Sequence, residues 1–359
     1  MSELRVLALV PSRLDVSPGQ RYRIEQWEPH LRTEGIRLDY ACFLDAPADE
    51  LLRQRGHVAR KAATLVGALV RRLRLARTAS GYDLVYLFRE SALLGPALVE
   101  RVLARRRIPY VFDFDDAVWV RYVSPANSYY SFLRFPGKTA TVCRKAREVM
   151  AGNAFLAAYA RRYNERVTVV PTTIDTEAYR PLPVRASGVP VVGWTGSHST
   201  ARYLELIRPA LERLRELTTF RMVVVGATGF AARGVEIEHR PWRSATEVQD
   251  LSDFDVGVMP LADTDWERGK CALKALQYMA LGVPPVVSPV GVNADVVEEG
   301  RTGLLARSTE EWVEALRALV EKPELRGRLG SAARARVEAA FSMRVHAPRV
   351  ARLFREAAA

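Results

Sequence analysis

Residues 253–306 of the sequence are DFDVGVMPLADTDWERGKCALKALQYMALGVPPVVSPVGVNADVVEEGRTGLLA. An apolar run ends at Met259, a polar loop follows, and the spacing of apolar residues then predicts a helix over 272–281. Two short apolar runs, at 285–287 and 303–306, predict further strands. Strands that alternate with helices in this way are typical of a parallel sheet covered by helices.

The same alternation extends outward from this stretch in both directions. It is interrupted over 171–190 by a patch with four prolines and no apolar periodicity, which is the best candidate for a linker. We predict strands at 4–10, 36–43, 84–88, 110–114, 189–194, 221–225 and 254–259, and helices at 21–34, 92–106, 201–217, 310–321 and 323–340.

This pattern predicts an α/β protein with two Rossmann-like, doubly wound domains that face a cleft. A chain of 359 residues is long enough for two such domains. We place the N-terminal domain at 1–172 and the C-terminal domain at 173–342, and we expect the last helix, within 343–359, to return to the N-terminal domain. Ligands of such proteins bind at the carboxyl ends of the strands, so the loops after the strands are the candidate sites.

Composition narrows the class of protein and the compartment. The net charge of +12 favours anionic partners such as nucleic acid, phosphorylated substrates or an anionic membrane, although a surface that uses arginine for solubility gives the same total. The three cysteines are scattered, which argues against a disulfide framework or a zinc site and favours a reducing cytoplasm. The first residues lack the pattern of a signal peptide, and no apolar run reaches the roughly 18 residues of a membrane-spanning helix.

Several common enzyme motifs are missing from the sequence. No GxGxxG follows the first predicted strand, which disfavours a nicotinamide or flavin enzyme, and no GxxxxGK[ST] supports a P-loop NTPase. HExxH, GxSxG and zinc-deaminase signatures are also missing.

The helix predicted near 272–281 carries residues suited to a diphosphate. Lys270 and Lys274 lie four residues apart and Gln277 follows on the same predicted face, if the helix starts near Lys270. The first turn of such a helix binds phosphate through unpaired N–H groups and the helix dipole. Two lysines would add positive charge, and the amide side chain suits a ribose diol. The alternative is a packing helix with solvated lysines.

This frame resembles the donor-binding region of the family 4 glycosyltransferases, which are retaining, metal-independent enzymes with the GT-B fold. That family typically has two glutamates separated by seven residues and followed by AMA-x-G-x-P-V-V. Here Gly269 and Gln277 stand at the glutamate positions, and YMALG and VPPVV follow. The resemblance, in particular to a bacterial subgroup of exopolysaccharide and lipopolysaccharide assembly, implies donor contacts from Lys270 and Lys274. It also implies that Gln277 takes the ribose contact, whereas the sugar contact of the first glutamate does not carry over to Gly269.

Two further stretches resemble parts of the same donor site. In VGWTGSHSTARYLELI (192–207), Gly196 would allow a phosphate to approach, Ser197 offers a hydroxyl and a helix cap, and Arg202 is the nearest cation. In RPWRSATEV (240–248), Trp242 would stack on the nucleotide base. The alternatives are a simple capped helix start and a buried core tryptophan.

The N-terminal half offers acidic residues at a strand end. The stretch YVFDFDDAVW (110–119) places Asp113, Asp115 and Asp116 where clustered carboxylates raise one another's pKa and act as bases. They would also suit Mg²⁺, but the two-domain pattern argues against the metal-binding GT-A fold, so we predict no metal site. We assign the catalytic role to Asp115 or Asp116, because Asp113 is more readily a structural cap or pair.

The first loop and a basic helix complete the candidate sites. Gly19 lies in the loop after the first strand, and Arg21 opens the predicted helix that also carries Arg23. Resemblance to the family implies that these residues make contacts on the acceptor side, and a solvated helix start is the alternative. Residues 53–77 contain eight Arg or Lys and no acid, with Leu65 and Val66 on a predicted apolar face and with Lys61 and Arg72 opposite. A basic amphipathic helix suits an anionic membrane surface, although an ordinary surface helix has the same composition.

The sequence thus predicts a glycosyltransferase that moves a sugar from a nucleotide-diphosphate sugar to a hydroxyl of a lipid-linked or glycan acceptor. No cofactor or metal is expected. The alternatives are a sugar-nucleotide epimerase on the same fold and a degenerate, non-catalytic binding protein. A nucleic-acid partner is disfavoured, because no strand interleaves aromatic and basic residues. The base, the sugar and the acceptor depend on pocket shape and are not specified.

Overall fold

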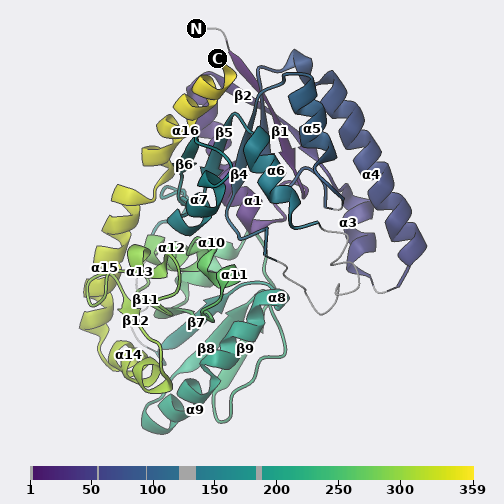
Figure 1. Ribbon diagram of the computed structural model, residues 1–359. Coiled ribbons are helices and arrows are strands. Elements are labelled where there is room, and N and C mark those ends of the chain that lie inside the picture. The colour runs from purple at the N-terminus through teal and green to yellow at the C-terminus, as the bar shows by residue number, and fades with distance from the viewer. Residues whose placement is uncertain (1–2, 55, 94, 121–134, 183–187) are drawn as a thin grey trace. The chain divides into compact units, whose positions relative to one another are not determined.

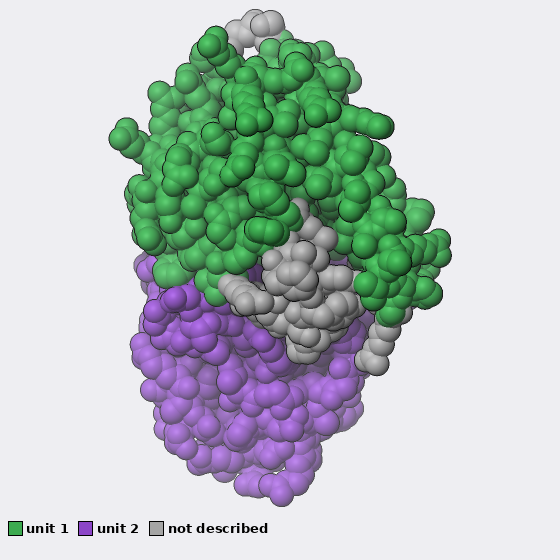
Figure 2. Space-filling view, turned by 45° about the vertical axis from the view of Figure 1, so that its right-hand side comes forward, with its two compact units in different colours: residues 1–172, 346–359 green, residues 173–345 purple. Residues whose placement is uncertain are grey.

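The computed structural model describes residues 3–54, 56–93, 95–120, 135–182 and 188–359. The chain divides into two compact units (Figure 2): unit 1 comprises residues 1–172 and 346–359, and unit 2 comprises residues 173–345. Each unit has one six-stranded sheet with helices packed on it (Figure 1). The predicted α/β class with two Rossmann-like units is therefore confirmed.

The sheet of unit 1 has the strand order β2-β1-β3-β4-β5-β6, and its strands pair in parallel. Three predicted strands, at 4–10, 84–88 and 110–114, have the predicted bounds, because each is a largely apolar run in which most residues are buried. The last two strands were missed, since runs of four and three residues carry no usable periodicity. The strands are β1 Leu4–Val10, β2 Ile36–Cys42, β3 Leu84–Phe88, β4 Tyr110–Phe114, β5 Glu148–Ala151 and β6 Val167–Val169.

The helices of unit 1 follow the strands, but the continuous helix predicted over 21–34 is wrong. Ile24 has a φ of −144°, outside the helical region, and Pro29 starts a new helix because it cannot donate a backbone hydrogen bond. The helices are α1 Pro18–Arg23, η1 Glu25–Trp27, α2 Glu28–Thr33, α3 Ala46–Arg53, α4 Val58–Thr78, η2 Ala79–Gly81, α5 Leu98–Arg105, α6 Lys138–Lys145 and α7 Ala154–Arg161.

Helix α4 packs on unit 1 with a face that differs from the predicted one. The apolar face was expected to exclude Lys61 and Arg72, yet these two residues are buried, with exposures of 2% and 3%, whereas Val66 is 60% exposed. The long apolar stems of lysine and arginine permit this burial. Arg72 Nη2 donates to Val10 O at 3.0 Å, and burial lowers the pKa of Arg72 to about 10.

The last helix, α16 (Met343–Ala358), contributes its residues from His346 onward to unit 1. The ring of Phe354 lies 5.7 Å from that of Tyr86 on β3, and Arg355 pairs with Glu34 after α2. Among the described helices, none is both long and apolar enough to cross a lipid bilayer.

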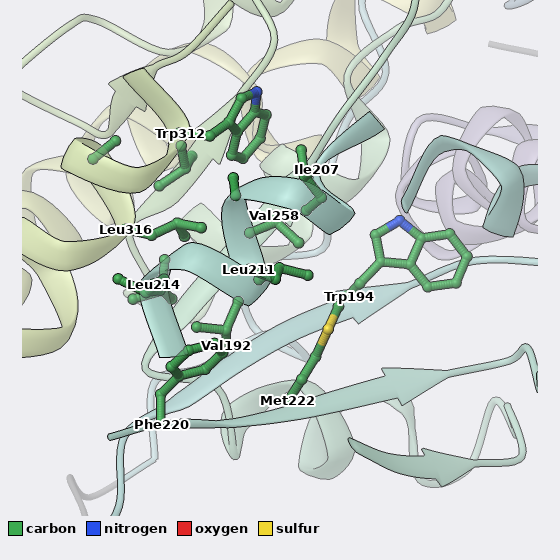
Figure 3. Close-up of a cluster of buried hydrophobic side chains, with 14 of the residues drawn as sticks. Val192, Trp194, Ile207, Leu211, Leu214, Phe220, Met222, Val258, Trp312 and Leu316 are labelled. Atoms are coloured by element: carbon green, nitrogen blue, oxygen red, sulfur yellow. The ribbon is translucent and has the colours of Figure 1, made fainter. Parts of the chain in front are cut away.

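The sheet of unit 2 has the order β12-β11-β10-β7-β8-β9, again with parallel pairing. Its core packs Leu211 and Leu214 of α9 against Val192 and Met222 of the sheet (Figure 3). The edge strand β9 was missed, because its sequence EIEHR is polar and only partly buried. The strands are β7 Val191–Thr195, β8 Arg221–Val225, β9 Glu236–Arg240, β10 Val256–Met259, β11 Pro285–Val287 and β12 Leu304–Leu305.

The helix predicted over 201–217 is three separate segments, since Pro209 starts the last of them. The Pro-rich patch is anchored to unit 2 where it is described: Ile174 bridges Ser342, and Arg334 donates to Thr176 O at 2.8 Å. The helices of unit 2 are α8 His198–Ala201, η4 Arg202–Leu206, α9 Arg208–Leu217, α10 Glu247–Ser252, α11 Asp265–Arg268, α12 Leu273–Ala280, α13 Asn293–Val296, α14 Thr309–Glu321 and α15 Pro323–Ala340.

Candidate functional site

Helix α12, which carries the predicted donor site, begins after Ala272 rather than near Lys270. Ala272 has a φ of +54°, in the left-handed region, so the helix does not continue back through this residue. The prediction that Lys270 and Lys274 share one helix face is therefore wrong. Each ammonium instead lies over an indole: Lys270 Nζ is 5.4 Å from the ring centre of Trp266, and Lys274 Nζ is 5.6 Å from that of Trp194.

The first turn of α12 lies beside the carboxyl end of β7. Tyr278 on α12 accepts a hydrogen bond from Thr195 N at 3.0 Å, which ties the helix to the end of that strand. In the described structure no side chain caps the first turn of α12, so its leading amides are suited to an anion. Lys274 stands in the same turn, over Trp194 of β7. The dipole of α12, the amides of its first turn and the ammonium of Lys274 therefore all favour a negative charge at the start of this helix.

The loops after β7 and β8 hold this place in a fixed shape. An added Cβ on Gly226, whose φ is +88°, would lie 2.2 Å from Gly196 O, so the two loops meet backbone to backbone. A Cβ on Gly196 would lie 2.6 Å from indole carbons of Trp194 and 2.7 Å from Thr200 Oγ1. Glycine is thus required at Gly196 by close approach, and the loop presses on the same indole that supports Lys274.

Ser197 and Arg202 both engage protein groups. Ser197 Oγ shares a hydrogen bond of 2.8 Å with Ser199 Oγ, and Ser197 N donates to Thr200 Oγ1 at 3.1 Å, so this part of the loop starts α8 as a capped helix would. Arg202 Nη2 lies 3.4 Å from Glu267 Oε1, a carboxylate that is only 3% exposed. The charge that Arg202 offers to a ligand is therefore partly neutralised.

Trp242 and Gln277, the predicted nucleoside contacts, share one buried carboxylate that we did not predict. Glu247 accepts hydrogen bonds from Trp242 Nε1 at 2.8 Å, from Gln277 Nε2 at 3.0 Å and from Tyr179 OH at 2.6 Å. Glu247 and Gln277 are 2% and 3% exposed, whereas Trp242 is half-buried. Glu247 therefore orients both predicted residues, and its position five residues after Trp242 at the start of a helix was the available signal.

In unit 1, the predicted acceptor contact of Arg23 is wrong. Arg23 is fully buried, and its guanidinium donates to both carboxylate oxygens of Asp113, with Nε 3.0 Å from Oδ2. Tyr86 OH donates to the same carboxylate at 2.5 Å. Burial raises the pKa of Asp113, although Arg23 acts in the opposite direction. This group is structural, as the alternative interpretation of Asp113 proposed.

Asp115 and Asp116 are brought together by Arg89, which sequence reasoning missed. Arg89 Nε and Nη2 donate to Asp115 at 2.5 and 2.9 Å, and Nη2 lies 2.7 Å from Asp116 Oδ2. Arg89 follows β3 with a φ of +54°, a conformation that non-glycine residues rarely adopt and that recurs at functional sites. The two carboxylates share one guanidinium, so they form a partly neutralised cluster at the carboxyl edge of the sheet and not two adjacent free anions.

The first loop packs directly on this cluster. A Cβ on Gly19 would lie 2.6 Å from Arg89 Nη2 and 2.9 Å from Asp115 Oδ2, so glycine permits the contact. The fully buried Gln20 holds the loop by accepting from Ser12 N at 3.0 Å and donating to its carbonyl at 3.1 Å. Gln20 also was not predicted.

Arg21 lies on α1 beside this loop. Its Nε forms an ion pair with Asp15 Oδ1 at 2.9 Å, and its side chain is 11% exposed. Because little of the Arg21 side chain is exposed, a ligand that contacts Arg21 would also contact Asp15. The three residues predicted on the acceptor side all lie on α1. The structure brings Gly19 to the carboxylate cluster, leaves Arg21 nearby on the same helix, and buries Arg23.

Comparison with known proteins finds a family match for the segment that contains α12 and the loops after β7 and β8, but not for the site residues of unit 1. Residues 189–322 match the family model described as Glycosyl transferases group 1. Two proteins named D-inositol 3-phosphate glycosyltransferase are similar: one from Arthrobacter sp. (strain FB24) is 28% identical over 46% of this chain and 43% of its own length, and one from Stackebrandtia nassauensis is 29% identical over 47% and 44%. The chain thus spans less than half the length of the curated relatives it matches.

Similar solved structures cover the whole chain. A glycosyltransferase from Rickettsia africae ESF-5 has a TM-score of 0.71 at 13% identity over 99% of both chains. Sucrose-phosphate synthase from Thermosynechococcus elongatus has a TM-score of 0.68 at 16% identity over 98% of both chains. Anabaena Alr3699/HepE, solved with UDP and glucose, has a TM-score of 0.68 at 16% identity over 98% of this chain and 99% of that one. At these identities the likeness shows the fold, which is that of the GT-B class.

Proposed function

We propose that this protein is a glycosyltransferase that moves a sugar from a nucleotide-diphosphate sugar to a hydroxyl group. One observation carries the proposal. The uncapped start of α12 and Lys274, held over Trp194, converge at the carboxyl end of β7, inside the segment that matches the glycosyltransferase family model. A helix start with an adjacent cation is suited to a diphosphate.

The donor site then divides into a phosphate end and a nucleoside end. Lys274, Lys270 and the first amides of α12 stabilise the negative charge that grows on the departing diphosphate, which is where preorganised donors lower a barrier most. The loop at Gly196 closes on the phosphates. Trp242 supplies a half-buried aromatic face for the base, and Gln277 contacts the ribose. The complexes of Anabaena Alr3699/HepE with UDP and UDP-glucose support a uridine nucleotide as the first donor to test.

For the reaction itself we propose retention of configuration without a nucleophile from the protein. The leaving phosphate takes the proton of the acceptor hydroxyl on the same face of the sugar, and the enzyme contributes position and charge. Asp115 and Asp116 accept hydrogen bonds from the acceptor substrate and so orient it, because Arg89 already neutralises part of their charge. Arg21 stands on the same side for a phosphorylated acceptor, the kind that the names of the curated relatives indicate.

We also propose that catalysis requires no metal ion. In the described ranges no group of three His, Cys, Asp or Glu side chains is placed to hold one. The carboxylates nearest to such a role, Asp115 and Asp116, bind Arg89. Turnover that survives a chelator would support this, and turnover that a divalent ion restores after chelation would contradict it.

A membrane surface is the proposed location of the acceptor, in polysaccharide assembly on the inner face of the cell membrane. Helix α4 supports this with a corrected face: Ala62, Val66 and Val70 point to solvent, and Arg74 and Arg77 are exposed beside them. An exposed apolar strip with basic flanks suits a bilayer that contains anionic lipids.

The test of donor binding is a melting experiment with a panel of nucleoside diphosphates and their sugar conjugates. A nucleotide at a hundred times its Kd stabilises the folded protein by about 2.7 kcal/mol, so one base should stand out. Lys274→Ala should lose most of that shift and all detectable transfer, whereas Lys322→Ala, at an exposed position on unit 2, should keep both. A folded Lys274→Ala protein with full transfer would refute the assignment. Incubation with sugar nucleotide alone, followed by a search for an epimer, separates transfer from epimerisation.

A further inference from the structure

Unit 1 has a pocket between the last turns of α5 and α6. It is lined by Arg101, Ala104, Arg105 and Lys145 and has a volume of about 350 Å³. In the described part of the chain no carboxylate lines this pocket or pairs with its three cations. The volume is sufficient for a phosphate group with a small alcohol attached, at the lower end of the usual range for ligand pockets.

The charge around the pocket exceeds what helix ends ordinarily attract. The C-terminal end of a helix carries about half a negative charge, so a basic residue in the last turn is common. Here the two helix ends together offset about one of the three lining cations. Further exposed cations follow in the stretches 106–107 and 144–147, which contain no acid: Arg106, Arg107, Arg144 and Arg147. The nearest acids in the sequence are the buried Glu100 and the half-buried Glu148. The surface around the pocket is therefore strongly positive.

The pocket is separate from the acceptor cluster of the same unit. Helices α5 and α6 run back toward the start of β4 and β5, so their last turns lie at the amino edge of the sheet. Arg89, Asp115 and Asp116 follow β3 and β4 at the carboxyl edge. A ligand in the pocket would thus occupy a second site of unit 1.

The chemistry of the pocket favours a terminal phosphate. Arginine presents a planar fork of donors that matches two oxygens of a phosphate, and two such forks with one ammonium suit an ion of high charge. A terminal phosphate carries about −1.5 to −2 at neutral pH, more than a phosphodiester.

The neighbouring helix indicates where this phosphate comes from. α5 packs on α4 and on α6, and the three helices lie side by side in unit 1 (Figure 1). α4 exposes Val66 and Val70, at 60% and 40%. A bilayer that contacts those side chains would bring phosphate headgroups close to the helices that pack beside α4.

We propose that Arg101, Arg105 and Lys145 bind the terminal phosphate of a membrane lipid headgroup at a site distinct from the donor and acceptor sites. The choice of a lipid as the source of the phosphate rests on the membrane contact proposed for α4, whereas the phosphate site itself depends neither on that contact nor on sugar transfer. The bound lipid would fix the orientation of unit 1 on the bilayer.

Vesicle binding of the full chain tests this proposal. The vesicles contain phosphatidylcholine with either phosphatidic acid, which has a terminal phosphate, or phosphatidylglycerol, which has a phosphodiester, adjusted to equal surface potential. The wild type should bind the phosphatidic acid vesicles more tightly. The double variant Arg101→Ala with Lys145→Ala should bind them about tenfold more weakly and should no longer distinguish the two lipids. The matched control, Arg349→Ala with Arg352→Ala, removes two exposed charges from α16 of the same unit and should keep the preference.

The proposed site would be refuted if the pocket variant and the control lost the same amount of affinity for phosphatidic acid vesicles. It would also be refuted if the wild type bound both lipids equally tightly. Soluble glycerol phosphate, titrated by calorimetry, is the second arm: binding as tight as that to the vesicles would assign the pocket to a soluble phosphate and overturn the lipid. Val66→Glu on α4 tests the membrane contact separately. If Val66→Glu binds vesicles normally while the pocket variant loses phosphatidic acid, the contact of α4 fails and the phosphate site stands.

Discussion

Gly196→Ala tests the shape of the donor loop with the smallest possible change. The new methyl carbon would lie 2.6 Å from two ring carbons of Trp194, where ordinary contacts begin at 3.4 Å, so the ring would have to move by about 0.8 Å. Trp194 is 1% exposed and packs in the core beside Met222 (Figure 3), so that movement displaces other side chains. Overpacking of this kind costs about 1–3 kcal/mol. Because Lys274 rests on the same ring, nucleotide binding should weaken as well.

The assay is the melting temperature of the variant with and without nucleoside diphosphate. Gly327→Ala is the matched control, because an added Cβ there meets no heavy atom within 4 Å and the residue lies inside α15. In a helix interior this change should be neutral or should stabilise the protein by about 0.5–1 kcal/mol. If Gly196→Ala melts like Gly327→Ala and binds nucleotide like the wild type, then the loop is not held against Trp194 as the structure shows.

Three further variants test the groups that sequence reasoning missed or left open. Arg89→Ala should lose sugar transfer, because the carboxylates of Asp115 and Asp116 lose the cation that they share. Nucleotide should still raise the melting temperature of this variant, because the proposed donor site is in unit 2, and an unchanged transfer rate would contradict the role of Arg89. Glu247→Gln should destabilise the protein by about 1–3 kcal/mol and weaken nucleotide binding. The carboxylate of Glu247 accepts three hydrogen bonds, and the amide that replaces it has only one oxygen to accept them. Calorimetric titration of the variant with nucleotide measures the change in affinity. Glu100 on α5 is 2% exposed and accepts a hydrogen bond of 2.6 Å from Ser91 Oγ. Burial raises the pKa of Glu100, so the wild type loses stability as the pH rises through that raised pKa. Glu100→Gln should therefore be less sensitive to pH than the wild type in melts from acidic to neutral pH.

The fold was predictable where burial alone decides local structure. The run that became β3 is apolar from end to end, those that became β4 and β8 are apolar except for Asp113 and Arg221, and each was placed with its observed bounds. The helix predictions were wrong where a single backbone angle decides whether a helix continues. Nothing in the type of residue marks Ala272 as left-handed or Ile24 as non-helical, yet these two positions end or break the predicted helices. The outer face of α4 was misplaced because an arginine is assumed to face water, whereas Arg72 is buried through its stem.

The candidate site was predictable as a set of loops but not as a set of contacts. Asp115 and Lys274 were found because each stands at the end of a buried strand or the start of a helix. Arg89 was missed, although it also follows a buried strand, because its role depends on the register of β3 with β4, which pairs Phe88 with Asp113. Such partners become visible only when the order of the strands is known.

The glutamine at 277 is the departure from the family pattern that the structure best explains. Gln277 Nε2 lies 3.0 Å from Glu247 Oε1, and both side chains are almost fully buried. A glutamate there would place two carboxylates at that distance, which at an effective dielectric constant of 20 is worth about 5 kcal/mol of repulsion if both are charged. One of them would therefore keep its proton, and its pKa would rise.

Gln277→Glu should consequently be most stable at low pH and should lose stability as the pH rises through that raised pKa, because the proton holds the pair together only below it. Melting temperatures of Gln277→Glu and the wild type across pH 5 to 9 measure the difference. The exchanged double variant, Gln277→Glu with Glu247→Gln, restores one amide and one carboxylate and should recover most of the loss at high pH. If Gln277→Glu alone is as stable as the wild type at the alkaline end, the hydrogen bond between Gln277 and Glu247 does not set the identity of this position, and the ribose contact must be sought elsewhere.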